Sequence, residues 1–146
     1  MKLVVQRSLK SNVSVNNKIV GKIDHGYVVL VGFSVDDNVN DIDYLVNKLI
    51  NLRIFEDREG KMNLSIKDVG GSVLSISQFT LYADARNGNR PSFTKSMSFD
   101  KAKILYDIWN KKLKEKNVNV ETGIFGADMT VNIINDGPIT IILESR

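Results

Sequence analysis

The sequence of 146 residues contains no cysteine, a single histidine and only two prolines. Without cysteine the chain can form no disulfide, has no thiolate nucleophile and offers no sulfur ligand to a metal. The lone histidine, His25, excludes sites built from several histidines and leaves one candidate for a Ser-His-Asp arrangement. We therefore expect neither a metal site nor a bound cofactor.

The sequence also lacks any apolar run close to the roughly 20 residues that a membrane-spanning helix needs. The apolar residues at the N-terminus are interrupted by Gln6 and Arg7, too early for a secretory signal. No linker or repeat divides the chain, and 42% hydrophobic with 25% charged residues is typical of a folded domain. These features predict one domain over residues 1–146, in the cytoplasm and without a membrane partner.

The net charge of the chain is +3. A positive chain favours polyanionic partners, but a solvated lysine-rich surface has the same charge. Charge alone therefore leaves nucleic-acid binding open.

Most of the chain has the patterns of β-strands. Residues 13–15 and 18–23 predict a hairpin across Asn16 and Asn17, which tolerate positive φ. Residues 27–31 and 73–76 are continuous apolar runs, typical of strands covered on both faces. Further strands are predicted over residues 52–55, 129–133 and 139–143, and a surface loop over residues 82–91.

Two segments follow the period of an amphipathic helix. The first begins near Asn40, and its apolar stripe is Ile42, Leu45, Val46, Leu49 and Ile50. The second is capped by Asp100, and its inward stripe is Ile104, Leu105, Ile108, Trp109 and Leu113. The order strands, helix, strands, helix, strands predicts an α/β fold of mixed, mainly antiparallel sheets with two helices on one face.

A first candidate site lies where the second buried strand ends, at Ser77-Gln78-Phe79-Thr80-Leu81. A hydroxyl becomes a nucleophile only when a base lies within hydrogen-bond reach. The segment contains no base, so Ser77 would need His25, which we expect to be exposed in a turn. The plain alternative is a strand end with Phe79 and Leu81 inward and with Gln78 and Thr80 outward.

A second candidate site opens the last strand, at Asn135-Asp136-Gly137-Pro138-Ile139-Thr140. These residue types are also those of a tight hairpin turn. However, an X-Pro bond prefers trans by only about 0.5–1 kcal/mol, so a cis Gly137–Pro138 peptide is accessible. Glycine lets backbone approach a ligand closely, and proline restricts the direction of the chain.

Together the two segments resemble the signature motifs of the D-aminoacyl-tRNA deacylases. Other stretches match this family in the same order, so the resemblance covers essentially the whole chain. They are Val5-Gln6-Arg7, Arg53-Ile54-Phe55, Gly60-Lys61-Met62-Asn63-Leu64, Gly88-Asn89-Arg90-Pro91-Ser92-Phe93 and Gly123-Ile124-Phe125-Gly126-Ala127-Asp128-Met129.

The resemblance implies a three-layer α/β/β fold and a homodimer that hydrolyses the ester of D-aminoacyl-tRNA, a chiral proofreading step in translation. Some cleavage of glycyl-tRNA is expected too. The cis Gly137–Pro138 dipeptide is expected to reach into the partner's active site and exclude L-amino acids, held in place by Arg7. The pocket is expected to contain Ser77, Gln78, Phe79 and Thr80, with Phe125 and Met129 against the substrate or its terminal adenosine.

Without a side-chain base, catalysis is expected to rely on the substrate's vicinal hydroxyl and on an oxyanion hole of the Gln78 to Thr80 N–H groups. The 3′ acceptor end of tRNA is the expected partner, and DNA is not. Its phosphates would meet Arg86, Arg90, Lys95 and the basic face formed by Lys111, Lys112, Lys114 and Lys116. Two alternatives remain: a non-catalytic dimeric RNA-binding adaptor, and a general esterase that uses Ser77 with His25.

Overall fold

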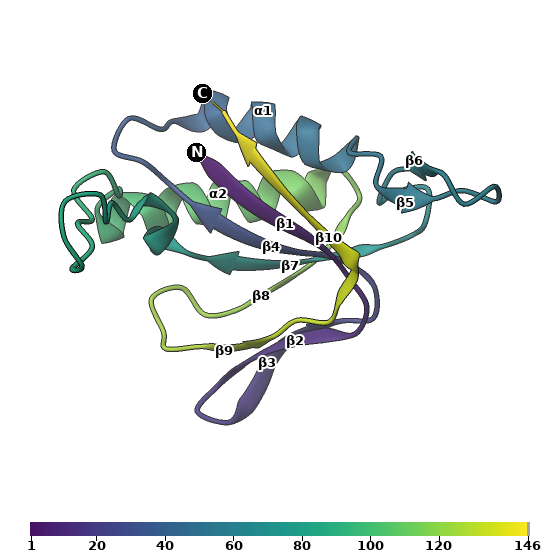
Figure 1. Ribbon diagram of the computed structural model, residues 1–146, viewed down its shortest axis with the longest axis horizontal. Helices are drawn as coiled ribbons and strands as arrows, with labels where there is room; N and C mark the ends of the chain where they lie inside the picture. Colours follow the sequence, from purple (N-terminus) through teal and green to yellow (C-terminus); the bar gives the residue numbers. More distant parts are fainter. Residues whose placement is uncertain (146) are drawn as a thin grey trace.

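A computed structural model describes residues 1–145, which form three layers (Figure 1). Two helices, α1 (Val39–Ile50) and α2 (Phe99–Glu115), cover one face of a five-stranded sheet, and a three-stranded sheet covers the other. The predicted α/β fold of mainly antiparallel sheets with two helices on one face is confirmed. The five-stranded sheet has the order β10 (Asn135–Glu144), β1 (Lys2–Ser8), β4 (Gly26–Gly32), β7 (Ser72–Ser77) and β8 (Asn119–Thr122).

The smaller sheet has the order β3 (Lys18–Ile23), β2 (Ser11–Val15) and β9 (Thr130–Asn132). Its β2–β3 hairpin is the predicted one, and Asn16 and Asn17 adopt φ values of 49° and 61°. The sheet packs on β4 and β7 through a second apolar cluster that is separate from the core under the helices. Strand β4 is therefore buried on both faces, as its continuous apolar run predicts.

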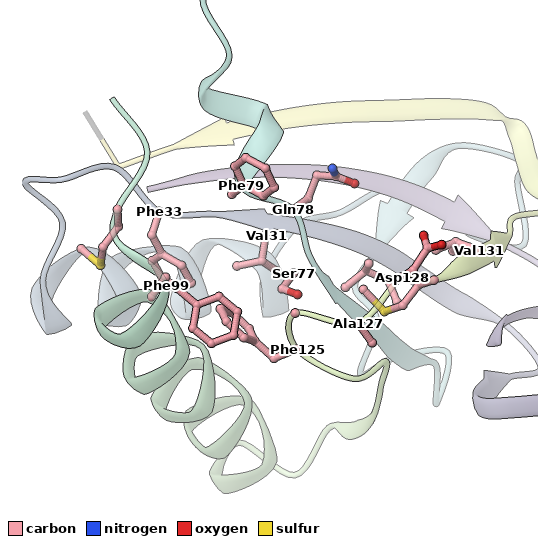
Figure 2. A pocket seen from close by; sticks show the side chains of 15 residues that line it. Val31, Phe33, Ser77, Gln78, Phe79, Phe99, Phe125, Ala127, Asp128 and Val131 are labelled. Atoms are coloured by element: carbon pink, nitrogen blue, oxygen red, sulfur yellow. The ribbon is translucent and has the colours of Figure 1, made fainter. Parts of the chain in front are cut away.

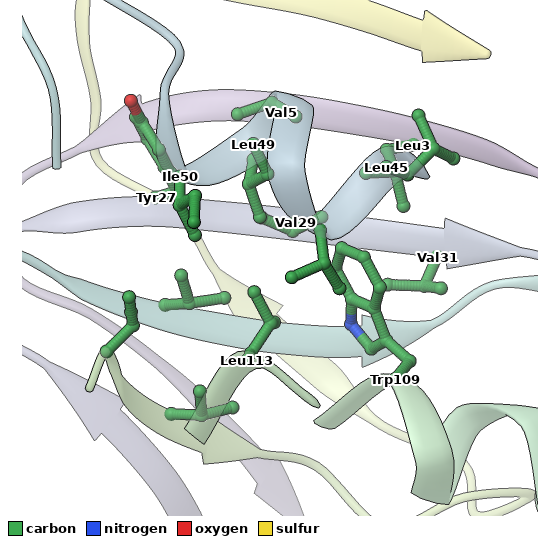
Figure 3. Packing of buried hydrophobic residues seen from close by; sticks show 14 of the residues in the cluster. Leu3, Val5, Tyr27, Val29, Val31, Leu45, Leu49, Ile50, Trp109 and Leu113 are labelled. Atoms are coloured by element: carbon green, nitrogen blue, oxygen red, sulfur yellow. The ribbon is translucent and has the colours of Figure 1, made fainter. Parts of the chain in front are cut away.

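The larger core lies between the five-stranded sheet and the helices (Figure 3). Helix α1 buries all five residues of its predicted stripe. It begins with a capping box, in which the Asn38 side chain accepts from the Asn40 N–H and the Asp41 carboxylate accepts from the Asn38 N–H, both at 2.9 Å. Among the described residues, no helix is long and apolar enough to cross a membrane.

Helix α2 corrects two predictions. It begins two residues earlier than expected, after Ser98, so Asp100 lies in its first turn and is not the cap. Ile104 was predicted to face inward but is 61% exposed, whereas Tyr106 is buried. The rotation is set by hydrogen bonds to β7, where the Tyr106 hydroxyl donates to the Ser75 carbonyl at 2.7 Å and the Trp109 indole donates to the Ser75 hydroxyl at 3.2 Å.

The strand predicted over residues 52–55 is largely wrong. The chain there leaves α1 through a turn, and only β5 (Phe55–Glu56) forms, paired with β6 (Met62–Leu64). Strand β8 was not predicted, because Asn119, Glu121 and Thr122 give it a polar composition. The predicted loop over 82–91 is largely exposed, and backbone hydrogen bonds of 2.8 Å between Asp84 and Ser92 close it.

Strand direction determines where a ligand can bind. The adjacent strands β4, β7 and β8 are parallel, whereas β1, which lies between β10 and β4, runs antiparallel to both of its neighbours. The carboxyl ends of the three parallel strands therefore meet at one edge of the sheet. Open α/β sheets commonly bind ligands at such an edge.

The buried α-amino group of Met1 gives a first prediction. It contacts the Asp37 carboxylate at 2.5 Å and donates to the Ser145 hydroxyl at 2.8 Å. Because Asp37→Asn leaves the ammonium buried without its counter-charge, we expect a loss of about 3–5 kcal/mol in the free energy of unfolding. Urea unfolding at fixed protein concentration measures it, with the exposed Asp24→Asn as a control expected to change stability by at most about 0.5 kcal/mol. Equal stability of the two variants would show that the ion pair between the Met1 α-amino group and Asp37 does not stabilise the fold.

Candidate active site

A cavity of about 570 Å³ opens at the carboxyl edge of β4 and β7 (Figure 2). Two strand ends, the start of α2 and the segment after β8 surround it. Its lining is mainly apolar, and Asp128 is the one ionisable side chain among the described residues that line it. The lining residues are Val31, Phe33, Ile76, Ser77, Gln78, Phe79, Met97, Phe99, Ala102, Phe125, Gly126, Ala127, Asp128, Met129 and Val131.

One wall is the turn that follows β7. The strand ends at Ser77, and a 3₁₀ turn, η1 (Phe79–Tyr82), begins two residues later. The predicted alternation is wrong here: Phe79 is 57% exposed, because the chain leaves the pleated strand before it. Ser77, Gln78 and Phe79 line the cavity as expected, whereas the exposed Thr80 is not among its described lining residues. The Thr80 hydroxyl instead accepts a hydrogen bond from the Gln78 side-chain amide.

The backbone of this turn offers N–H groups to a ligand. The Gln78 N–H already donates to the Val31 carbonyl at 2.7 Å, so it is not available for the predicted oxyanion hole. The first N–H groups of a helical turn have no partner within the turn. Within residues 1–145, neither the Phe79 nor the Thr80 N–H makes a hydrogen bond outside it. These two N–H groups are therefore the backbone donors that remain at the start of the turn.

The opposite wall is aromatic. The Phe125 ring packs edge-on against Phe99 (Figure 2), with 5.1 Å between their centroids. Its centroid also lies 5.5 Å from that of the Tyr106 ring. Gly126, with φ of 77°, lets the loop pass the Phe99 ring, because a Cβ there would lie 2.6 Å from it. Both Phe125 and Met129 line the cavity. Three further lining residues, Phe33, Met97 and Phe99, were not predicted, because no local pattern distinguishes them from core residues.

The second predicted segment forms a bulge in β10. Gln6 of β1 pairs with Thr140 and Ser8 pairs with Asn135, so one residue of β1, Arg7, faces residues 136–139 of β10. The Gly137–Pro138 peptide within this bulge is cis, as the resemblance implies, and both residues are exposed. The alternative of a hairpin turn between the last strands is wrong, since β9 and β10 belong to different sheets.

Arg7 holds the base of this bulge. It is only 6% exposed, and its Nε lies 3.3 Å from the Asp136 carbonyl and 3.1 Å from the Asp136 carboxylate. Its Nη1 donates to the Ile54 carbonyl at 2.9 Å. On the other side, the Asn135 amide oxygen accepts from the Ile139 N–H at 3.1 Å. The residues on both sides of Gly137 and Pro138 are thus fixed by side chains.

The bulge and the cavity lie at different ends of the sheet. Arg7 pairs with Tyr27, whereas Ser77 pairs with Val31, four positions further along β4. These positions span roughly 13 Å along the strand, and three strand spacings of about 4.8 Å separate β10 from β7. Within one chain, Gly137 and Pro138 therefore do not reach the cavity, and neither is among its described lining residues.

Comparison with known proteins identifies this arrangement. Residues 4–144 match the sequence model of the D-Tyr-tRNA(Tyr) deacylases. The chain belongs to the D-Tyr-tRNA(Tyr) deacylase family. It is therefore a hydrolase of aminoacyl-tRNA ester bonds, with D-aminoacyl-tRNA as its substrate class.

Solved structures share this fold. One described as c-Myc DNA Unwinding Element Binding Protein has a TM-score of 0.94 and 38% identity, over 100% of this chain and 99% of its own. A second, described as a probable eukaryotic D-amino acid tRNA deacylase, has a TM-score of 0.82 and 18% identity, over 98% of both chains. The second comparison supports the fold alone.

The structure excludes the Ser77–His25 esterase. Gly26 pairs with Ser72 and Val31 with Ser77, so His25 precedes the amino end of β4 while Ser77 ends β7. The two residues are roughly 17 Å or more apart. His25 is exposed, as predicted, and its Nε2 lies 3.0 Å from the Val69 carbonyl. A separate question is metal binding: within residues 1–145 the deacylase has no cluster of three His, Asp or Glu side chains that could hold a metal ion.

The basic residues predicted to bind tRNA occupy different environments. Arg86 and Lys95 flank Asp84, with contacts of 2.5 and 3.5 Å to its Oδ2, and the hydrogen bond from Arg86 holds the pKa of the Asp84 carboxyl well below its usual range. Arg90 is exposed in the same loop of the deacylase. The predicted basic face of Lys111, Lys112, Lys114 and Lys116 lies at the C-terminal end of α2, whereas the cavity is lined by Phe99 and Ala102 at its N-terminal end. We therefore do not expect these lysines to contact the acceptor end of the tRNA.

Proposed function

We propose that this deacylase is a homodimer in which Gly137 and Pro138 of the partner subunit complete each cavity and exclude L-amino acids. The observation that carries the proposal is the separation of the bulge from the cavity within one chain. Gly137 and Pro138 of the bulge are exposed and fixed on both sides, yet neither is among the described residues that line the cavity. A second copy related by two-fold symmetry would supply both missing dipeptides at once.

We attribute this exclusion of L-amino acids, the chiral filter, to main-chain atoms. The carbonyls of the exposed residues Gly137 and Pro138 would accept hydrogen bonds from the substrate ammonium group, and the rigid backbone would leave no room for an L side chain. Support comes from Arg7 and Asn135, which fix the backbone on each side of the dipeptide. A filter that rejects by steric clash accepts a substrate without a side chain. We therefore include glycyl-tRNA among the substrates.

The proposed mechanism uses the backbone of η1. Water attacks the ester carbonyl carbon, and the Phe79 and Thr80 N–H groups stabilise the oxyanion of the tetrahedral intermediate. The bond from this carbon to the ribose oxygen then breaks, the ribose oxygen takes up a proton, and the free amino acid leaves. The vicinal hydroxyl of the ribose orients the water, because the Thr80 hydroxyl is engaged by the Gln78 side-chain amide and no other hydroxyl is assigned to this task.

The tRNA would enter with its 3′ acceptor end, and the exposed Arg90 with Arg86 and Lys95 would meet phosphates near the cavity. This makes the reaction a proofreading step of translation, in the cytoplasm where aminoacyl-tRNA is used. A non-catalytic nucleic-acid-binding role is the alternative. The description of the 38% identical structure names a DNA element as that protein's ligand.

Hydrolysis of matched D-tyrosyl-, L-tyrosyl- and glycyl-tRNA by the purified protein tests the proposal. We expect rapid loss of the D ester, measurable loss of the glycyl ester and no enzyme-dependent loss of the L ester. Sedimentation at the assay concentration should give twice the mass of one chain. Binding of tRNA without cleavage of any ester would favour the adaptor role, and an active monomer would contradict the completion of the site by a partner subunit.

A further inference from the structure

Two aromatic rings stand exposed beside the cavity. Phe79 and Phe93 are 57% and 39% exposed, and their centroids lie 5.1 Å apart with an angle of 61° between the rings. Phe79 belongs to η1 and lines the cavity (Figure 2). The pair of rings is therefore located at the edge of the cavity. Phe93 lies outside the cavity lining. The pair therefore presents aromatic surface just outside the space expected to hold the reacting ester.

This pair is held in position by its neighbours. The Ser96 hydroxyl donates to the Phe79 carbonyl at 3.1 Å, and the Ser96 N–H donates to the Phe93 carbonyl at 2.9 Å. One residue thus ties η1 to the segment that carries Phe93. A rigid aromatic surface loses little entropy when a flat ligand binds to it.

The charge around the pair is positive. Residues 83–98 contain three cations, Arg86, Arg90 and Lys95, and one anion, Asp84, which gives a local charge of 3 − 1 = +2. Two of the cations lie within three residues of Phe93 in the sequence. Exposed aromatic rings among cations are the combination that binds single-stranded nucleic acid, through base stacking and phosphate contacts.

We propose that Phe79 and Phe93 form a stacking site for the nucleobase that precedes the ester-bearing nucleoside of the substrate. The inference rests on the proposed function and deepens it, because it extends substrate contact beyond the terminal nucleoside. The phosphate that joins the two nucleosides lies toward the Arg90 and Lys95 side chains. Stacking at this site is independent of base identity, since every base has an aromatic face.

The experiment compares two ester substrates, 3′-D-tyrosyl-adenosine and the 3′-D-tyrosyl ester of the trinucleotide CCA. For the unmodified protein we expect kcat/KM to be about tenfold higher with the trinucleotide. Phe93→Leu, which keeps an apolar side chain without an aromatic face, should abolish this gain and leave hydrolysis of the adenosine ester unchanged. Phe93→Trp should retain the gain.

A second measurement does not depend on hydrolysis. An unacylated trinucleotide with 2-aminopurine in place of its middle base should lose fluorescence on binding, because stacking quenches this base, and Phe93→Leu should weaken the quenching. An unchanged trinucleotide-to-adenosine ratio and unchanged quenching in Phe93→Leu would overturn the inference. So would an equal loss with both esters, or a shift from dimer to monomer, since Phe93 would then support the fold or the interface. If neither ester is cleaved but Phe93→Leu weakens the quenching, the stacking site is supported and the proposed activity is contradicted.

Discussion

Replacing Phe79 with proline is expected to lower kcat by about 10²–10³-fold, whereas Phe79→Ala should keep kcat within a few-fold. Phe79 is the first residue of η1, where proline is tolerated, and Gln78 before it lies outside the helical region, with φ of −146° and ψ of 83°. Proline therefore removes the N–H while the backbone path is kept. Both variants lose the aromatic ring, so their difference isolates the N–H group.

Single-turnover hydrolysis of saturating 3′-D-tyrosyl-adenosine measures this effect without contacts to the rest of the tRNA. Equal melting temperatures of the two variants would show that the turn is preserved. If Phe79→Pro and Phe79→Ala hydrolyse the ester at the same rate, the Phe79 N–H is not part of the oxyanion hole. The mechanism would then need a different hydrogen-bond donor.

The second large effect is expected for Gly137→Ala, which should lower D-tyrosyl-tRNA hydrolysis by about 10²-fold and reduce the ratio of D to L hydrolysis. Gly137 has φ of 127°, which side chains rarely adopt, and an added Cβ would lie 2.8 Å from the Ile139 side chain and 3.0 Å from its nitrogen. The bulge must therefore shift, and the proposed filter carbonyls shift with it. Rates with both esters measure the change.

Gly70→Ala is the matched control, because Gly70 also has positive φ, 61°, but no atom lies within 4 Å of an added Cβ. It should show the cost of alanine in the left-handed region at a site without a clash, while leaving the D-to-L ratio unaltered. A Gly137→Ala protein with normal D hydrolysis and normal rejection of the L ester would show that the dipeptide is not the filter. Mixed dimers of Gly137→Ala with a cavity variant would then test whether any residue acts across subunits.

The local sequence pattern was sufficient to predict burial in α1 and β4. The stripe of α1 was predicted correctly because its apolar residues recur with the period of a helix, and β4 because an unbroken apolar run indicates a strand buried on both faces. Helix α2 shows the limit of that reasoning. Its apolar residues allow more than one rotation, and the two hydrogen bonds to Ser75 select the rotation that buries Tyr106 and exposes Ile104.

The sequence by itself determined the fold class, the family and the two segments that carry the candidate site, because these depend on residue order and residue type. The tertiary structure decided how the groups are arranged. Strand pairing places the Gly137 bulge opposite Arg7 and away from the cavity, and the Val31 carbonyl engages the Gln78 N–H. Such contacts join residues distant in the chain, and their register is established only when the strands pair.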